Sequence, residues 1–184
     1  MAKLQSDGLT LDIKFMGFKD EWIEYEIKFY WKDDIIVNDN LLKREGEYWG
    51  KRSTGAFLAN DYQKDFLTET IREILQTNEP EYWEPLEPDA IIAIYPGTFF
   101  PFLKSHIIEE WIGEKEHEEN QKKKQNKGKQ PDDIFTIITF IDSYTFKENM
   151  AYSGEGISLH LIVTRENLEK FANDLEKEYR NLKS

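Results

Sequence analysis

The sequence predicts an α+β protein in which one antiparallel or mixed β-sheet of about five to six strands carries two main helices on one face. Apolar and polar side chains alternate along residues 9–16 and 23–31, as they do in half-buried strands. Apolar side chains recur at helical spacing over residues 62–75 and 168–179, as they do in amphipathic helices. With 184 residues, 39% of them hydrophobic, the chain is expected to form a single domain over residues 1–184.

The first half of the chain begins with a predicted hairpin. Residues 9–16 form its first strand, residues 17–21 interrupt the pattern with a glycine and charges, and residues 23–31 form the second strand. Residues 35–37 add a short third strand. A loop is expected over residues 45–55, which contain three glycines around Tyr48 and Trp49.

The first predicted helix covers residues 62–75. Asn60 or Asp61 can accept the free N–H groups of its first turn, and Asn78 and Pro80 end it. Residues 79–89 contain three prolines, and we therefore expect an extended linker there.

The second half adds three strands and a helix. Residues 90–95 are almost continuously apolar, which is typical of a strand buried on both faces. Residues 134–141 and 157–163 are rich in β-branched side chains and predict two further strands. Thr164 is expected to cap the final helix, whose apolar stripe consists of Leu168, Phe171, Ala172, Leu175 and Tyr179.

Residues 114–133 have the composition of a disordered charged insertion. They contain six acidic and six basic side chains and no apolar one, so they have nothing to bury in a core. The rest of the chain therefore carries the whole net charge of -12, which arises from 36 acidic and 24 basic residues. Such a charge repels nucleic acids and anionic membranes and attracts basic partners.

The composition also bears on location. The chain has 0 cysteines, no signal-peptide pattern at residues 1–8, and no apolar run near the ~20 residues of a membrane helix. We therefore expect a cytoplasmic protein without a membrane association.

The sequence predicts no catalytic, cofactor-binding or metal-binding residue. The three histidines, His106, His117 and His160, lie far apart and lack ligand spacing. Carboxylates at strand ends keep a carboxylate- or metal-dependent enzyme open as an alternative. They are Asp89, Asp132, Asp133 and Asp142, although aspartate is also common in turns at these positions.

A nucleic-acid site has weak support. Four basic residues surround Tyr48 and Trp49, and bases interleaved with aromatic rings can contact phosphates and stack on nucleobases. They are Lys43, Arg44, Lys51 and Arg52. Four such residues in a protein of charge -12 are more simply explained as a solvated loop, so no nucleic-acid partner is expected.

An acidic segment is the more informative charge pattern. No basic residue occurs between Arg72 and Lys104, whereas acids, aromatic rings and prolines follow one another there. Acids steer a basic partner, aromatic rings anchor it, and prolines lower the entropy cost of ordering. The predicted partner-binding residues are Glu79, Glu81, Tyr82, Trp83, Glu84, Glu87 and Asp89. In the alternative interpretation, Tyr82 and Trp83 pack on the core and the acids are only solvated.

The order of elements also resembles a known family. A hairpin and a helix followed by residues 83–89 (WEPLEPD), then a closing strand at 154–159 (GEGISL) and a helix from 164–168 (TRENL), are similar to WapI-type immunity proteins of bacterial toxin systems. The insertion at 114–133 and the glycine-rich loop at 45–55 depart from that plan. The resemblance implies a non-enzymatic inhibitor that binds a cognate toxin, and it transfers no catalytic residue.

Together these observations favour an acidic, immunity-like binding protein that neutralises a basic protein partner such as a toxin. A carboxylate- or metal-dependent enzyme is the first alternative, and an acidic scaffold or DNA-mimic protein is the second.

Overall fold

A computed structural model describes residues 2–37, 54–58, 66–85, 89–99, 133–143 and 154–183. These residues form an α+β fold, as the periodicity predicts. The elements are β1 (Ala2–Ser6), β2 (Leu9–Lys19), β3 (Trp22–Trp31), β4 (Asp34–Ile35), β5 (Gly55–Leu58), α1 (Leu67–Thr77), β6 (Glu81–Trp83), β7 (Ala90–Pro96), β8 (Ile134–Asp142), β9 (Gly156–Thr164) and α4 (Arg165–Lys183). The strands build two antiparallel sheets, where the sequence predicted one.

The larger sheet has the strand order β1-β2-β3-β4, and β5 also pairs with β3. The predicted hairpin is present, with Leu11 opposite Phe29 and Ile13 opposite Ile27. All four side chains are buried, because alternation sends them to the same face of the sheet. Of the third strand expected at residues 35–37, only Ile35 lies in a strand, the two-residue β4, which pairs with the end of β3.

The smaller sheet has the strand order β6-β7-β8-β9. Ile94 pairs with Ile137, which in turn pairs with Leu161, and these three side chains form one row across the sheet. All three are buried, so this row faces the core, and we call this side the inner face of the smaller sheet.

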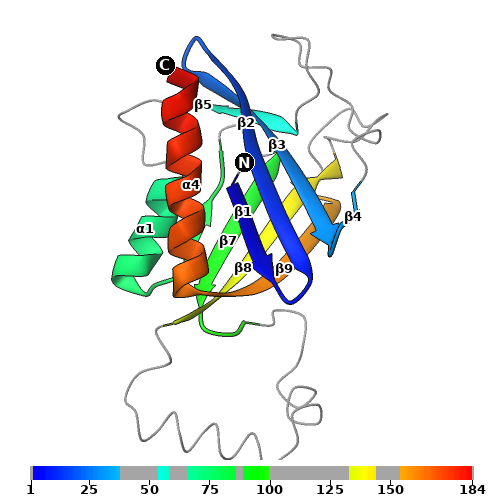
Figure 1. Cartoon of the computed structure of the whole chain (residues 1–184), viewed down its shortest axis with the longest axis vertical. Helices are drawn as coiled ribbons and strands as arrows, with labels where there is room; N and C mark the ends of the chain where they lie inside the picture. Colours follow the sequence, from blue (N-terminus) through cyan, green and yellow to red (C-terminus); the bar gives the residue numbers. More distant parts are fainter. Residues whose placement is uncertain are drawn as a thin grey trace, which may run out of the picture.

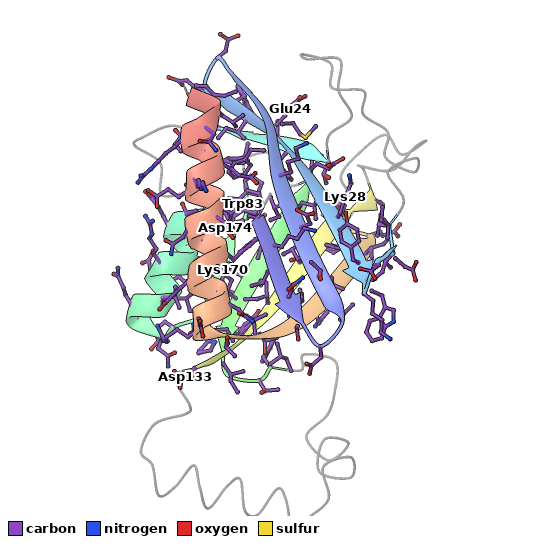
Figure 2. All side chains as sticks on the ribbon, viewed as in Figure 1. Glu24, Lys28, Trp83, Asp133, Lys170 and Asp174 are labelled. Atoms are coloured by element: carbon purple, nitrogen blue, oxygen red, sulfur yellow. The ribbon has the colours of Figure 1, made fainter. Side chains whose placement is uncertain are left out.

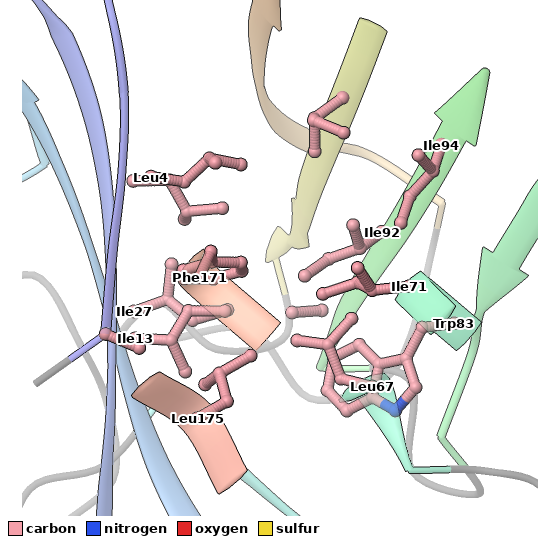
Figure 3. Close-up of a cluster of buried hydrophobic side chains, with 14 of the residues drawn as sticks. Leu4, Ile13, Ile27, Leu67, Ile71, Trp83, Ile92, Ile94, Phe171 and Leu175 are labelled. Carbon is pink, nitrogen blue, oxygen red and sulfur yellow. The ribbon is translucent and has the colours of Figure 1, made fainter. Parts of the chain in front are cut away.

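The two helices lie beside the sheets and complete one continuous core (Figure 1). Figure 3 shows Leu4, Ile13 and Ile27 of the larger sheet facing Ile92 and Ile94 of the smaller one, with Phe171 and Leu175 of α4 between them. The predicted stripe of α4 is confirmed, since Leu168, Phe171, Ala172 and Leu175 are buried and Tyr179 is partly buried.

The structure defines both ends of α1 and the first turn of α4. The α1 N-cap is Phe66, without a side-chain cap, and the expected caps Asn60 and Asp61 lie outside the described residues. As predicted, α1 ends at Asn78, which adopts a left-handed conformation and donates its N–H to the Ile74 carbonyl over 2.9 Å. Thr164 caps α4, because its Oγ1 accepts the Asn167 N–H at 3.3 Å.

The two sheets meet closely at Gly55, the first residue of β5. A Cβ atom at this position would lie 2.3 Å from Asp89 Oδ2, so only glycine leaves room for the buried Asp89 side chain. The expected loop over 45–55 therefore ends in a strand, and its other residues up to 53 lie outside the described part of the chain.

A buried carboxylate in the larger sheet should make the stability of the protein depend on pH. Asp12 is only 3% exposed, and its Oδ2 lies 3.7 Å from Lys3 Nζ. Burial raises the pKa of Asp12 above its usual range, although Lys3 and Lys28 partly offset this effect. The folded chain therefore binds a proton at Asp12 more readily than the unfolded chain, and the ionised form lowers stability at neutral pH.

We expect the unfolding free energy of Asp12→Asn at pH 7 to equal that of the wild type or to exceed it by up to about 1 kcal/mol. This advantage should shrink as the pH falls through the raised pKa of Asp12, where the folded wild type takes up its proton, and it should be gone below the ordinary pKa of an aspartate in the unfolded chain. Urea denaturation of both proteins at several pH values measures the difference. A variant that is less stable at pH 7 by more than about 1 kcal/mol would show that the carboxylate is stabilising.

The predicted insertion at 114–133 lies outside the described residues, apart from Asp133, which directly precedes β8. Within the described part of the chain, no helix has the length and apolar character needed to cross a membrane.

Candidate binding surface

The structure divides the seven predicted partner-binding residues into groups. Glu79, Tyr82 and Glu84 are exposed, and Glu81 is half-buried. Trp83 and Asp89 are buried, and Glu87 lies outside the described residues.

The segment expected to be a linker contains the edge strand β6, and this explains the division. Successive side chains of a strand point to opposite faces. Tyr82, opposite Ala93 of β7, is therefore 56% exposed, whereas Trp83, opposite Ile92, faces the core.

The expectation that Trp83 anchors a partner needs correction. The indole is 2% exposed and lies between the sheets and helices (Figure 2). Its ring centroid is 5.7 Å from that of Tyr25 and 5.5 Å from that of Phe57, with both pairs edge to face. Trp83 thus joins the two sheets, in agreement with the alternative interpretation in which it is a packing residue.

Asp89 is likewise a structural residue and not a surface charge. Its side chain fills the space beside Gly55, and its carbonyl accepts the Asp142 N–H over 3.0 Å. Asp142 is also buried, and its Oδ2 accepts the Gly154 N–H at 2.9 Å.

An aromatic triplet, which consists of Tyr82, Tyr95 and Phe99, covers part of the other side of the smaller sheet. The Tyr82 hydroxyl donates to the Tyr95 hydroxyl at 3.1 Å, and the two rings meet edge to face at 5.8 Å. The Phe99 ring stacks on the Tyr95 ring at 4.1 Å with an interplanar angle of 25°. The hydrogen bond with Tyr82, assisted by burial, raises the pKa of Tyr95 to about 12, so its phenol is neutral at physiological pH.

Buried Thr136 holds the triplet in place. Its Oγ1 donates to the Gly97 carbonyl at 2.8 Å and accepts the Phe99 N–H at 2.9 Å. Gly97 has a φ of 76°, a conformation that favours glycine, and its N–H donates to the Ile134 carbonyl at 2.7 Å. This turn folds the chain after β7 back over the sheet and brings Phe99 onto Tyr95.

The triplet belongs to a wider surface, which we call the outer face of the smaller sheet. Besides Ile134, Asp142 and Thr164 at the strand ends, the register places ten side chains on this side. Nine of these ten side chains are exposed or half-buried, and Thr136 is buried. The ten are Tyr82, Ile91, Ala93, Tyr95, Thr136, Ile138, Phe140, Ser158, His160 and Ile162. The core, with both described helices and the larger sheet, lies on the opposite side.

The charge of this surface is negative at one edge and otherwise close to zero. Glu79 and Glu84 are exposed on either side of Tyr82. No lysine or arginine occurs from residue 73 to residue 103. Burial lowers the pKa of His160 below its usual value, which favours the neutral imidazole at pH 7.

Two of the four carboxylate residues expected at strand ends come together in the structure. Asp89 and Asp142 are neighbours, because the Asp142 N–H bonds the Asp89 carbonyl, and both are buried. Asp133 lies at the other end of β8, and Asp132 is outside the described residues. No group of three or more His, Cys, Asp or Glu side chains in the described part of the chain could hold a metal ion. The basic residues proposed for nucleic-acid binding also lie outside it.

A hollow of about 600 Å³ lies elsewhere, between the β1–β2 turn and the end of β9. Its lining mixes the charged side chains Asp7, Lys32 and Asp33 with uncharged ones. None of the predicted partner-binding residues takes part in it.

The fold is thus that of an α+β protein built from two antiparallel sheets and two helices over the described residues. Compared with protein-family models, curated proteins and solved structures, the chain has no significant match in any of the three. Its function must therefore be inferred from its own residues.

Proposed function

We propose that the protein is a non-enzymatic, immunity-like binding protein of the cytoplasm, which neutralises a basic protein partner by covering the partner's functional site. One observation carries this proposal. Tyr82 displays an exposed ring between the exposed carboxylates Glu79 and Glu84, in a segment without a single basic residue.

The arrangement has the parts that a protein interface needs. A large, rigid aromatic side chain gives contact area at a low entropy cost, and Tyr82 is held in place by its hydrogen bond to Tyr95. The acids around it raise the association rate of a basic partner and reject acidic ones. The resemblance to WapI-type immunity proteins points in the same direction, since those proteins bind toxins.

The short strand β6 is also protected against unspecific pairing. It has three residues, and Pro80 and Pro85 flank it. Prolines and short length are common devices by which proteins prevent other strands from adding to a sheet edge. This favours recognition through side chains on the outer face over strand addition at β6.

We expect Glu79→Lys/Glu84→Lys to abolish the neutralising activity, because reversing two charges turns attraction into repulsion. The measurement is growth rescue in cells that express the product of a neighbouring reading frame that is toxic by itself. The wild-type chain should restore growth and the double variant should not. Association with the purified toxin should be about 10-fold slower for the variant at low salt, and the difference should fade at high salt.

Asp33→Lys/Asp34→Lys is the matched control, because it makes the same charge change at two exposed acids of the larger sheet. This control should rescue growth like the wild type. Equal rescue by both double variants would contradict the proposed site, and equal failure would show that only the total charge matters.

A further inference from the structure

The outer face has an unusual composition for a sheet surface. When one side of an antiparallel sheet covers the core, the other side normally carries polar residues. Here the central positions of the outer face are Ile91, Ala93, Ile138 and Phe140, and exposed Ile162 lies at its edge. Connected apolar surface of this kind marks an interaction site.

The position of Tyr82 adds a recognition element for a cation. Its ring stands at the edge of this apolar surface and is 56% exposed, while the bond to Tyr95 fixes its orientation. Glu84, two residues further along the chain and just past the end of β6, is also exposed. An aromatic face beside a carboxylate suits a guanidinium, which stacks on the ring and donates to the carboxylate in one plane.

Charge complementarity decides which occupant fits. Glu79 and Glu84 at the rim are uncompensated by any basic residue from 73 to 103, so an acidic or neutral segment gains nothing there. A second copy of this chain would bring the same carboxylates against each other, and each copy carries a net charge of -12. A basic segment with apolar side chains matches both the rim and the floor of the surface.

We infer that the outer face of the smaller sheet binds a segment of a basic protein in which an arginine stands beside apolar side chains. The arginine stacks on Tyr82 next to Glu84, and the apolar side chains cover Ile138 and Ile162. This inference rests on the proposed function and adds the chemistry of the recognised segment.

Three synthetic peptides of equal length test the inference on the full chain. The first carries arginines and leucines, the second has every arginine replaced by lysine, and the third has every leucine replaced by serine. Titration followed by NMR of the protein gives dissociation constants and the positions of the shifted signals. We expect the arginine–leucine peptide to bind about 10-fold more tightly than each of the others and to shift signals of Tyr82, Ile138 and Ile162.

Variants of the chain separate the ring from general effects. Tyr82→Ala should weaken the arginine–leucine peptide by about 10-fold and remove its advantage over the lysine peptide. Tyr82→Phe should retain this advantage, since the aromatic face remains. Trp31→Ala is the matched control, because Trp31 is 49% exposed but belongs to the larger sheet, and it should change nothing.

Three results would overturn the inference. The first is equal affinity for all three peptides, and the second is a set of shifted signals that map to another surface. The third is that no peptide binds and the signals of the outer face show it to be covered by another part of this chain or by a second copy. In each case the proposed function would still be supported if Glu79→Lys/Glu84→Lys lost growth rescue and the control Asp33→Lys/Asp34→Lys kept it. The two ideas can therefore fail separately.

Discussion

Replacing Trp83 by alanine should cost about 4–5 kcal/mol of unfolding free energy, a large part of the 5–15 kcal/mol that holds a typical domain together. The indole is almost fully buried and contacts Tyr25 of β3, Phe57 of β5 and the core beside α1. Its removal leaves a cavity between the two sheets, and two edge-to-face ring pairs are lost as well. Urea denaturation followed by far-UV circular dichroism measures this loss.

The adjacent residue supplies the control. Tyr82→Ala removes a ring of similar kind that is mostly in solvent, so it should cost less than about 1 kcal/mol. If Trp83→Ala lost no more stability than Tyr82→Ala, then Trp83 would not be a core residue, and the assignment of the two faces of β6 would be wrong.

Gly55→Ala should produce the second large effect, a loss of about 3 kcal/mol, at the upper end of what overpacking usually costs. The added Cβ would lie 2.3 Å from Asp89 Oδ2 and 2.6 Å from Asp89 Cβ. Asp89 cannot turn away easily, because it is completely buried and its carbonyl is bonded to the Asp142 N–H. The clash should therefore push β5 and β7 apart, and thermal unfolding at a fixed protein concentration measures the loss.

A second substitution shows whether the clash is the cause. In an Asp89→Gly background the obstructing side chain is absent, so adding Gly55→Ala should cost less than about 1 kcal/mol more. Gly154→Ala is a useful comparison, because a Cβ there meets nothing within 4 Å and only its φ of 70° is unfavourable. A Gly55→Ala protein as stable as the wild type would mean that the sheets do not approach closely at this point.

The elements with a long and regular pattern could be predicted from the sequence. Eight alternating residues in β2 and the apolar stripe of α4 identify a strand and a helix without any knowledge of the rest of the fold. β1, β5 and β6 have three to five residues each, too few for a pattern to stand out. The division into two sheets depends on pairings between distant segments, which local periodicity does not record.

The candidate surface could be predicted only in part, for the same reason. Acidic composition and aromatic residues drew attention to residues 79–84, and of the two aromatic side chains there Tyr82 is exposed and Trp83 is buried. Treating the segment as a linker concealed that neighbouring side chains of a strand point in opposite directions, and so Trp83 was assigned to the surface. Tyr95 and Phe99 were missed because they join Tyr82 only through the pairing of β6 with β7 and the turn at Gly97.

The packing of α4 on β1 and β2 has a consequence for folding during synthesis on the ribosome. Glu178 Oε2 accepts the Phe15 N–H at 3.0 Å, and these residues are 163 positions apart in the chain. At a translation rate of roughly 5–20 residues per second, the first hairpin waits about 8–30 s for the helix that covers it. During that time the part of its apolar face that α4 covers has no native partner, so the core stays incomplete until α4 has been synthesised.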